Sequence, residues 1–485
     1  MPSPNIQFYQ IPSGIRTPGF YFEFNTLLAV NSLPQNVYSV MIIAPMLASG
    51  TAAPNTPTQV FSDAQAAAYF GNGSIAHRMA RAALTANPAL MLWITGVMDA
   101  SSGNPLAAAG TVTISGAPTN SGVLTLMVDN DMLQVGISPT DTPTTITANL
   151  AAVLLTRPDL PVSYVTGAGG LTTFTAKNKG TVGNQIQLSA SVTAPGVGVA
   201  VVAMTGGAVD PETNYAAALA AAFPGSYSIY VVPWIDETNL QTLRTQVEAV
   251  SAYNQQRGAI GVGAFTGSLA GSTTLAGEIN DGRMNLPYFP GTPSAAFELA
   301  AAYASVMASS TDPAMPLNTL QLNGIGIPPL AAQLTPTEIE SLLWNGVTPI
   351  VVDSQQLPAI VRAVSTYTTN SSGIADPSLL DITTIRTLDY VRLACRTMMA
   401  LRFPRAKLTP DMPAKVRSAL YATLKQLEAL EEVQNVDANY PGLLVEQDSQ
   451  TVTQLDAKIP AAVVPGLDVF AARIDLLLQV GVSTS

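Results

Sequence analysis

The chain has 485 residues, of which 47% are hydrophobic and only 11% charged, against about 25% charged residues in typical soluble domains. This length predicts about three domains, and the hydrophobic content is enough for real cores, which excludes an intrinsically disordered chain. A net charge of −11 argues against nucleic-acid binding, because that function needs a basic surface.

The low charge has two interpretations, and the composition leaves both open. Copies of the same chain cover much of the surface, or the protein is an extracellular one coated with Ser, Thr and Asn. The one cysteine, Cys395, excludes an intramolecular disulfide and a Cys-cluster metal site, and we expect it to be a small buried side chain. The apolar run Val37–Leu47 is too short to span a bilayer, so we expect no membrane insertion.

The N-terminal segment, residues 1–30, is predicted to be extended. Phe20, Phe22 and Phe24 alternate with other residues at the period of a strand. Such a segment is either an edge strand of its own domain or an arm that adds a strand to a neighbouring sheet. Composition alone favours the edge strand.

Residues 31–99 and 208–355 have the pattern of one α/β domain. Apolar runs at 37–44 and 89–95 predict buried strands, and helices follow Ser62 and Ser74, which are good N-caps. The pattern resumes after residue 210 with further strands and helices, including a helix that begins at Thr335-Pro336. A run at 360–368 is also predicted to be a strand.

Residues 100–207 differ from both flanks. They contain few charges, many Gly and Thr residues, one predicted helix at 144–155, and strand-like runs at 110–114, 122–128, 132–137, 171–176 and 185–188. Gly- and Pro-rich stretches border the segment on both sides. We therefore predict a β-rich domain inserted into the α/β domain.

Residues 356–465 form the predicted C-terminal assembly domain, and 466–485 a C-terminal arm. Two long helices are expected, at 381–403 and 410–432. Nine basic and two acidic residues lie between Arg386 and Lys425, and the sign then inverts at Glu428. This change from basic to acidic residues indicates either a solvated helix face or a docking surface for a partner with the opposite arrangement of charges. The predicted fold class is multidomain α/β (α+β), with a mixed-sheet α/β core, an inserted β-rich domain and a C-terminal α+β assembly domain.

No motif in the sequence predicts catalysis. His77 is the one histidine, no Gly-x-Ser-x-Gly elbow is present, and the Gly-x-Gly pairs lack the third glycine of a nucleotide-binding loop. We therefore expect a structural or binding protein that is not an enzyme and has no cofactor and no metal.

Three stretches carry a resemblance to a known family. They are Ile11-Pro-Ser-Gly-Ile-Arg-Thr-Pro-Gly-Phe-Tyr-Phe-Glu-Phe-Asn25, Leu380-Asp-Ile-Thr-Thr-Ile-Arg-Thr-Leu-Asp-Tyr390 and Leu401-Arg-Phe-Pro-Arg-Ala-Lys-Leu408. Together with residues 52–73, 175–184, 348–367 and 444–448, they resemble the contractile tail sheath protein of Mu-like bacteriophages. The resemblance covers most of the chain in order, although no single motif in it is chemically diagnostic.

The resemblance implies a homo-oligomer of stacked hexameric rings around a tail tube protein, with baseplate and tail terminator proteins as further partners. It implies a virion tail component, assembled in the host cytoplasm, that contracts to drive the tube through the host envelope. The C-terminal domain would face the tube, and the inserted domain would face outward. Terminal arms would link subunits by strand exchange, which reverses the interpretation favoured by composition.

The residues expected in these contacts form two sets. The arm set is apolar and consists of Ile6, Phe8, Ile11, Phe20, Phe22, Phe24, Val469, Phe470, Ile474, Leu476 and Leu478. The tube-facing set is charged and consists of Lys415, Arg417, Lys425, Glu428, Glu431 and Glu432. Two alternatives remain: the sheath of a tailocin or prophage-derived injection system, and a secreted β-rich surface or adhesion protein.

Overall fold

The structure is a computed structural model that describes residues 14, 16–22 and 33–476. Its described residues divide into two compact units. One unit comprises residues 36–390 together with the tail from residue 463, and the other comprises 391–462 together with the chain up to residue 35. Each unit is described separately below.

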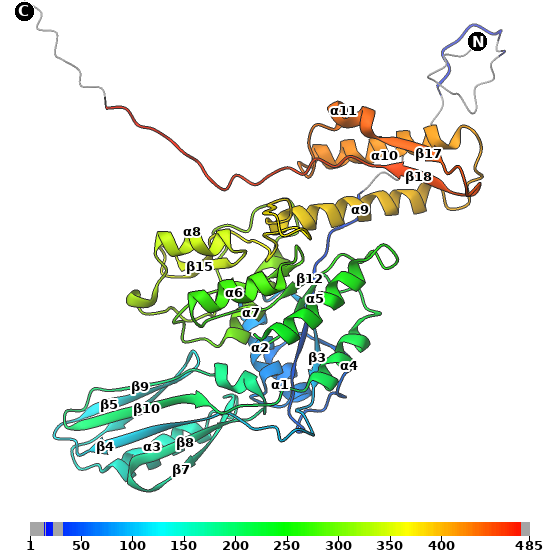
Figure 1. The fold of residues 1–485 in the computed structure, drawn as a ribbon. Coiled ribbons are helices and arrows are strands. Elements are labelled where there is room, and N and C mark those ends of the chain that lie inside the picture. The colour runs from blue at the N-terminus through cyan, green and yellow to red at the C-terminus, as the bar shows by residue number, and fades with distance from the viewer. Residues whose placement is uncertain (1–13, 15, 23–32, 477–485) are drawn as a thin grey trace, which may run out of the picture. The chain divides into compact units, whose positions relative to one another are not determined.

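The first unit is built around a six-stranded mixed sheet (Figure 1). Its strand order is β13-β12-β11-β1-β3-β2, with β1 Ser39–Pro45, β2 Pro57–Val60, β3 Met91–Val97, β11 Ile229–Val231, β12 Ile260–Val262 and β13 Met284–Asn285. Strand β1 runs parallel to both of its neighbours, and β2 is the antiparallel edge. Every residue of β1 is buried, as expected for a strand that is covered on both faces.

Helices pack around this sheet or against one another, and several begin at the capping residues that the sequence predicts. They are α1 Asp63–Phe70, α2 Ile75–Ala86, α4 Glu212–Ala222, α5 Glu237–Ser251, α6 Leu269–Ile279, α7 Ala296–Ser309 and α8 Pro336–Trp344. Helix α8 packs against a strand of the small sheet described below. The side chains of Ser62, Ser74 and Thr335 each accept a hydrogen bond from a first-turn amide. Helix α7 is buried along nearly its whole length and packs against α2.

A second, small sheet of the first unit has the order β14-β15-β16. Its strands are β14 Pro287–Tyr288, β15 Thr348–Val352 and β16 Pro358–Ile360. The strand predicted at 360–368 is therefore wrong beyond Ile360. The residues that follow are held by isolated backbone bridges and by side-chain hydrogen bonds, such as that from Ser365 Oγ to the Leu379 carbonyl at 2.7 Å.

Two antiparallel sheets lie between β3 and α4 in the chain (Figure 1). Their orders are β10-β4-β8-β7 and β6-β5-β9. The elements are β4 Ala109–Gly116, β5 Gly122–Val128, β6 Asp131–Ile137, α3 Pro143–Leu155, β7 Val162–Thr166, β8 Leu171–Ala176, β9 Leu188–Val192 and β10 Val197–Thr205. Inward-facing Val, Leu and Ile residues alternate with exposed ones along these strands, which is the pattern of a two-sheet core.

The second unit holds the C-terminal helices and one hairpin. Helix α9, Ile382–Arg402, runs from the first unit into the second and is followed by α10 Met412–Ala429, α11 Val436–Asn439, β17 Leu444–Gln447 and β18 Leu455–Lys458. The predicted fold class is confirmed, because the chain combines a mixed-sheet α/β core, an inserted β-rich region and a C-terminal α+β region. The exact domain boundaries stay a prediction.

Candidate assembly surfaces

The N-terminal segment exposes large aromatic side chains. Phe20 and Phe22 are almost fully accessible and lie outside any helix or strand. The other predicted arm residues of this terminus, Ile6, Phe8, Ile11 and Phe24, lie outside the described residues.

The described part of the C-terminal tail, residues 463–476, begins at a fixed root. Asp468 accepts a hydrogen bond from Asn318 Nδ2 at 2.7 Å and lies 3.3 Å from Arg362 Nη2. Arg362 is itself held by two hydrogen bonds of 2.8 Å to the carboxylate of Asp381. These contacts tie Asp468 to the first unit.

Beyond Asp468 the tail presents apolar side chains to solvent. Phe470 is 83% exposed and Ile474 is 95% exposed, and Val469 and Leu476 are similarly accessible. Leu478 lies outside the described residues. Such exposure is costly for a lone chain, so this segment is a candidate for burial against another molecule.

The hairpin of β17 and β18 offers a place where a strand can be added. Val445 is buried, on the face that packs toward α10, while Leu444 and Glu446 are exposed on the other face. Within the part of the chain that the structure describes, each strand pairs only with the other. Both outer edges therefore present backbone N–H and C=O groups that can receive a further strand.

Four of the six predicted tube-facing residues are engaged within the second unit. The Arg417 guanidinium lies 4.2 Å from the centre of the Tyr440 ring. Lys425 contacts Glu428, and Glu428 also accepts a hydrogen bond from the Val436 amide at 2.9 Å. Glu432 is only 4% exposed.

The other two predicted tube-facing residues, Lys415 and Glu431, are exposed. They lie near opposite ends of α10. The tube-facing assignment of all six residues stays a prediction.

A buried ion-pair cluster joins the inserted sheets to the core. Arg78, on α2, is 3% exposed and donates from Nε and Nη2 to Glu298 of α7 at 2.9 and 2.6 Å. It also donates from Nη1 to Asp131, at the start of β6, at 2.5 Å. Burial disfavours the charge of Arg78, but these carboxylates outweigh it and raise the pKa of the guanidinium.

The cluster continues toward the surface through two further arginines. Arg157 bridges Asp131 and Asp159, at 2.6 and 2.9 Å. Arg81 bridges Asp159 and Asp63, at 2.8 and 3.1 Å. Because Arg78 and Arg81 lie on the core helix α2, the ion pairs cross repeatedly between the core and the inserted region.

One carboxyl group beside this cluster has a described hydrogen-bond partner for only one of its two oxygens. Asp129 is completely buried, and its Oδ1 accepts a hydrogen bond from the Gln187 amide at 2.8 Å. Its Oδ2 has no hydrogen-bond partner among the described residues. Burial, followed by the charge of Glu298, raises the pKa of Asp129 well above its usual range, even though Arg78 opposes the shift.

His77 also belongs to this region and has a structural role. Its Nδ1 accepts from the Gly73 amide at 3.0 Å, and its Nε2 lies 2.9 Å from Asp63. Burial lowers the pKa of this imidazole, although Asp63 acts in the opposite direction. Among the described residues, no group of His, Cys, Asp and Glu side chains is arranged to hold a metal ion.

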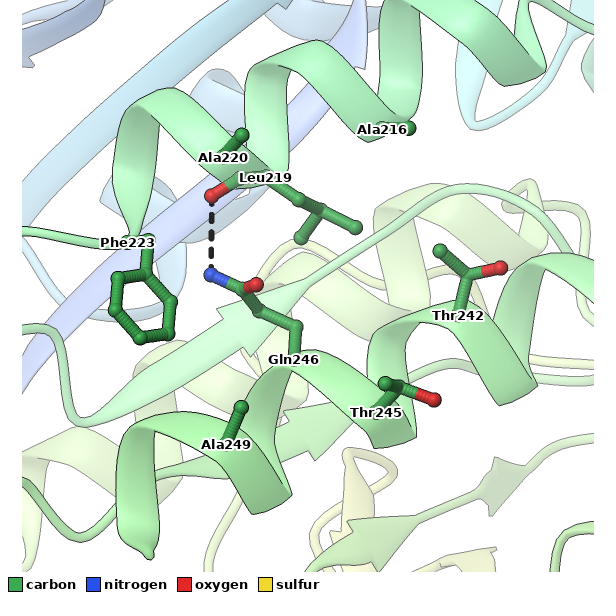
Figure 2. Close-up of a pocket in the computed structure, with 8 residues that line it drawn as sticks. All are labelled: Ala216, Leu219, Ala220, Phe223, Thr242, Thr245, Gln246 and Ala249. Carbon is green, nitrogen blue, oxygen red and sulfur yellow. Dashed lines mark hydrogen bonds between the residues drawn. The ribbon is translucent and has the colours of Figure 1, made fainter. Parts of the chain in front are cut away.

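A shallow groove of about 560 Å³ lies between α4 and α5 (Figure 2). Gln246 crosses it and donates to the Leu219 carbonyl at 3.0 Å. The lining is otherwise mostly alanine, threonine and the ring of Phe223, with no charged side chain. The groove therefore has no acidic or basic side chain that could act as a general acid or base or activate its threonine hydroxyls.

Sequence reasoning did not identify the ion-pair cluster or the tail root. The partners of Arg78 lie 53 and 220 residues away in the chain. The one sequence feature that could have pointed to the cluster is that its charged residues stand in stretches that are otherwise poor in charge. Separately, none of the helices in the described part of the chain has the length and hydropathy needed to cross a bilayer.

Family comparisons cover most of the chain. Residues 209–366 match the phage tail sheath protein central domain, and residues 375–476 match the phage tail sheath C-terminal domain. The Mu-like prophage FluMu tail sheath protein of Haemophilus influenzae is 30% identical over 492 residues, which is 98% of this chain and all of that relative.

Solved structures of sheath proteins resemble the fold. The sheath tail protein of Listeria innocua has a TM-score of 0.52 and 13% identity, over 90% of this chain and 94% of that one. The sheath tail protein of Desulfitobacterium hafniense has a TM-score of 0.49 and 14% identity, over 89% of this chain and 94% of that one.

Proposed function

The chain belongs to the phage tail sheath family, and from that premise we propose how it assembles: as stacked hexameric rings around a tail tube. The observation that carries the proposal is the match to a tail sheath protein along the whole chain, from end to end. Contraction of the rings would drive the tube through the host envelope. The subunit is a component of the virion tail, and we propose that it assembles in the host cytoplasm.

The proposed mechanism uses no bound nucleotide and no catalytic group. The extended sheath is the state of higher free energy, and contraction buries more surface between neighbouring subunits. Subunits move as near-rigid bodies, while flexible connections keep the lattice continuous. The ion pairs between α2, α7 and the inserted region support this, because they tie that region to the core within one subunit.

We propose that both terminal segments are arms that enter sheets of neighbouring subunits. This assignment is supported by four exposed apolar side chains, those of Phe20, Phe22, Phe470 and Ile474. Their exposure to water is unfavourable in a monomer and would be relieved by contact with another subunit. The open edges of the β17–β18 hairpin are the proposed receivers. Baseplate and tail terminator proteins would bind the end rings of the same lattice.

We also propose that the second unit faces the tube through α10. A contact that must release during contraction is expected to be polar and weak. The exposed charges of Lys415 and Glu431 suit such a contact better than the internally paired Arg417, Lys425 and Glu428. We propose separately that the inserted domain faces outward.

Electron microscopy of the purified full-length protein at rising concentration tests the proposal. Hollow helical tubes or stacked rings are the expected result, and averaging them gives the symmetry. A chain with Phe470→Ser and Ile474→Ser is expected to stay monomeric. The matched control replaces two exposed apolar residues of the inserted region, Leu155→Ser and Val165→Ser, and is expected to assemble normally.

Two results would contradict the proposal. One is a protein that stays monomeric at every concentration, even with a purified tail tube added as a template. The other is equal assembly of the tail variant and the control. A tailocin sheath remains the second candidate, since the related sheath protein is encoded by a prophage. Particles purified from the producing cell distinguish the two, because a phage tail joins a DNA-filled head.

A further inference from the structure

The exposed face of the β17–β18 hairpin carries an unfavourable charge arrangement. Glu446 and Asp456 are directly opposite each other in the ladder, and both are exposed. Like charges directly opposite each other destabilise a pair of strands. Within the described residues, neither carboxylate forms a salt bridge. Asp456 accepts a hydrogen bond from the neutral amide of Gln454 at 2.7 Å, so no described cation of the same chain offsets the repulsion. Lys458 lies on the same face, two residues after Asp456.

The C-terminal tail carries a complementary pattern. Arg473 and Asp475 form an ion pair of 2.6 Å within the tail, with side chains 87% and 64% exposed, so they lie on one side of the extended chain. Phe470, Ile474 and Leu476 alternate with them and therefore lie on the other side. Around Ile474, the tail thus carries a cation and an anion two residues apart on one side and apolar side chains on the other.

We propose that the tail of one subunit adds in parallel to the free edge of β18 in a second subunit, with Arg473 beside Asp456 and Asp475 beside Lys458. This inference rests on the proposed function and deepens it, because it assigns the residues that fix the register of the arm. In this register Ile474 falls beside Ala457, on the face of Val445 that packs toward α10. Charge and hydrophobicity therefore select the same pairing.

The other three ways of adding the tail satisfy fewer charges. An antiparallel strand on β18 also places Arg473 beside Asp456, but it leaves Asp475 beside Gln454. A parallel strand on β17 that brings Arg473 to Glu446 also brings Asp475 to Asp448, which is repulsive. The antiparallel alternative on β17 places Asp475 beside Leu444.

The parallel direction also favours a strand that comes from another molecule. Parallel neighbours in one chain need a crossover of a dozen or more residues. Within one chain, residues 459–472 would have to form that crossover, and Asp468 among them is instead bonded to Asn318 and Arg362. The same tether gives the donating subunit a fixed point from which its tail extends.

Reciprocal charge reversal tests the inference. One variant reverses the hairpin, with Asp456→Lys and Lys458→Asp. A second reverses the tail, with Arg473→Asp and Asp475→Lys. Each alone is expected to raise the concentration needed for polymer formation at least tenfold, measured by sedimentation and electron microscopy. All four side chains are exposed, and circular dichroism checks that each variant is folded.

Two combinations are expected to restore assembly: one chain with all four substitutions, and an equal mixture of the two reversed variants. Recovery in the mixture shows that the contact forms between molecules. The matched control reverses a partly exposed ion pair elsewhere, Arg244→Glu with Glu248→Arg on α5, and is expected to leave the critical concentration unchanged. Because Arg244 also donates to the Ile279 carbonyl, circular dichroism checks that this control is folded.

Assembly that is unaffected by either reversal, or that the four-fold variant does not recover, would overturn this inference while the unaltered chain still polymerises. Recovery of the hairpin variant by Arg16→Asp in place of the tail reversal would also overturn it, because the N-terminal arm would then be the ligand. Failure of the unaltered chain to polymerise would instead count against the proposed function and remove the basis of this inference.

Discussion

Asp129 is a residue of the inserted region whose protonation makes the stability of the fold depend on pH. Its carboxyl is completely buried, and one of its oxygens has no described hydrogen-bond partner. Burial and the nearby Glu298 raise its pKa above that of the same group in the unfolded chain, which is about 3.9. Folding therefore stabilises the protonated form of this group.

The pH dependence follows from that sign. The stabilisation from Asp129 is fully present below its unfolded pKa and is lost as the pH rises through its higher folded pKa. Asp129→Asn imitates the neutral form and keeps the acceptor for the Gln187 amide. We expect this variant to gain stability at pH 8 but not at pH 4, as measured by thermal unfolding. An equal change at both pH values would contradict the assignment.

Substitution of Glu298 tests how much a buried charge contributes to stability compared with an exposed one. Glu298→Gln leaves Arg78 in a buried site with one charged partner fewer, and breaking a buried pair costs about 3 kcal/mol or more. For a unit that spans residues 36–390, with an unfolding entropy of about 2.1 cal/mol/K per residue, that lowers the melting temperature by roughly 4 °C. Glu248→Gln removes an exposed partner of Arg244 and is the control, with a loss below about 1 kcal/mol. Similar losses in both variants would show that Arg78 does not depend on Glu298.

At the scale of elements, the contacts of Asp468 fix the start of the proposed C-terminal arm. Asp468→Asn weakens the pair with Arg362 but keeps an acceptor for Asn318. Arg362→Met removes the cation and also frees Asp381. We expect Arg362→Met to speed limited proteolysis within residues 463–476 several-fold, and Asp468→Asn to have a smaller effect. Unchanged cleavage in Arg362→Met would show that the root is held in another way.

The elements of the core were predictable because their patterns are strong. The apolar runs that became β1 and β3 are nearly continuous, and Ser62, Ser74 and Thr335 predict helix starts that the structure confirms. The strands β4, β5, β6 and β8 also follow from alternation. The sequence thus indicates the mixed α/β class without any partner information.

Other elements were missed for physical reasons. In β10, Val197–Thr205, exposed positions are filled by Gly, Ala and Val, so the sequence shows no contrast between its two faces. In β7, Val162–Thr166, the exposed Val165 is apolar and the half-buried Tyr164 is aromatic, which weakens the contrast between the two faces. The pairing of the charged residues in the ion-pair cluster could not be predicted either, because it depends on how β6 lies relative to α2 and α7 in the folded chain.

For the whole molecule, the central prediction concerns the N-terminal arm. Deleting residues 1–25 is expected to leave the described core folded, since β1 begins at Ser39, but to stop the stacking of rings. Circular dichroism and thermal unfolding report the fold, while electron microscopy reports the length of the polymers. Polymers of normal length from the truncated chain would contradict the assignment of an N-terminal arm.

The strand order of the main sheet also sets the order in which a ribosome-bound chain can fold. Strand β1 is made early, yet its second neighbour, β11, begins at Ile229, after the whole inserted region has been synthesised. At about 5–20 residues per second this delay lasts on the order of ten seconds. During that time the inserted sheets, whose contacts are local, can close, while one edge of β1 waits unpaired. Nascent subunits are therefore most vulnerable to aggregation before residue 231 emerges, and a chaperone that shields apolar strands would act in that interval.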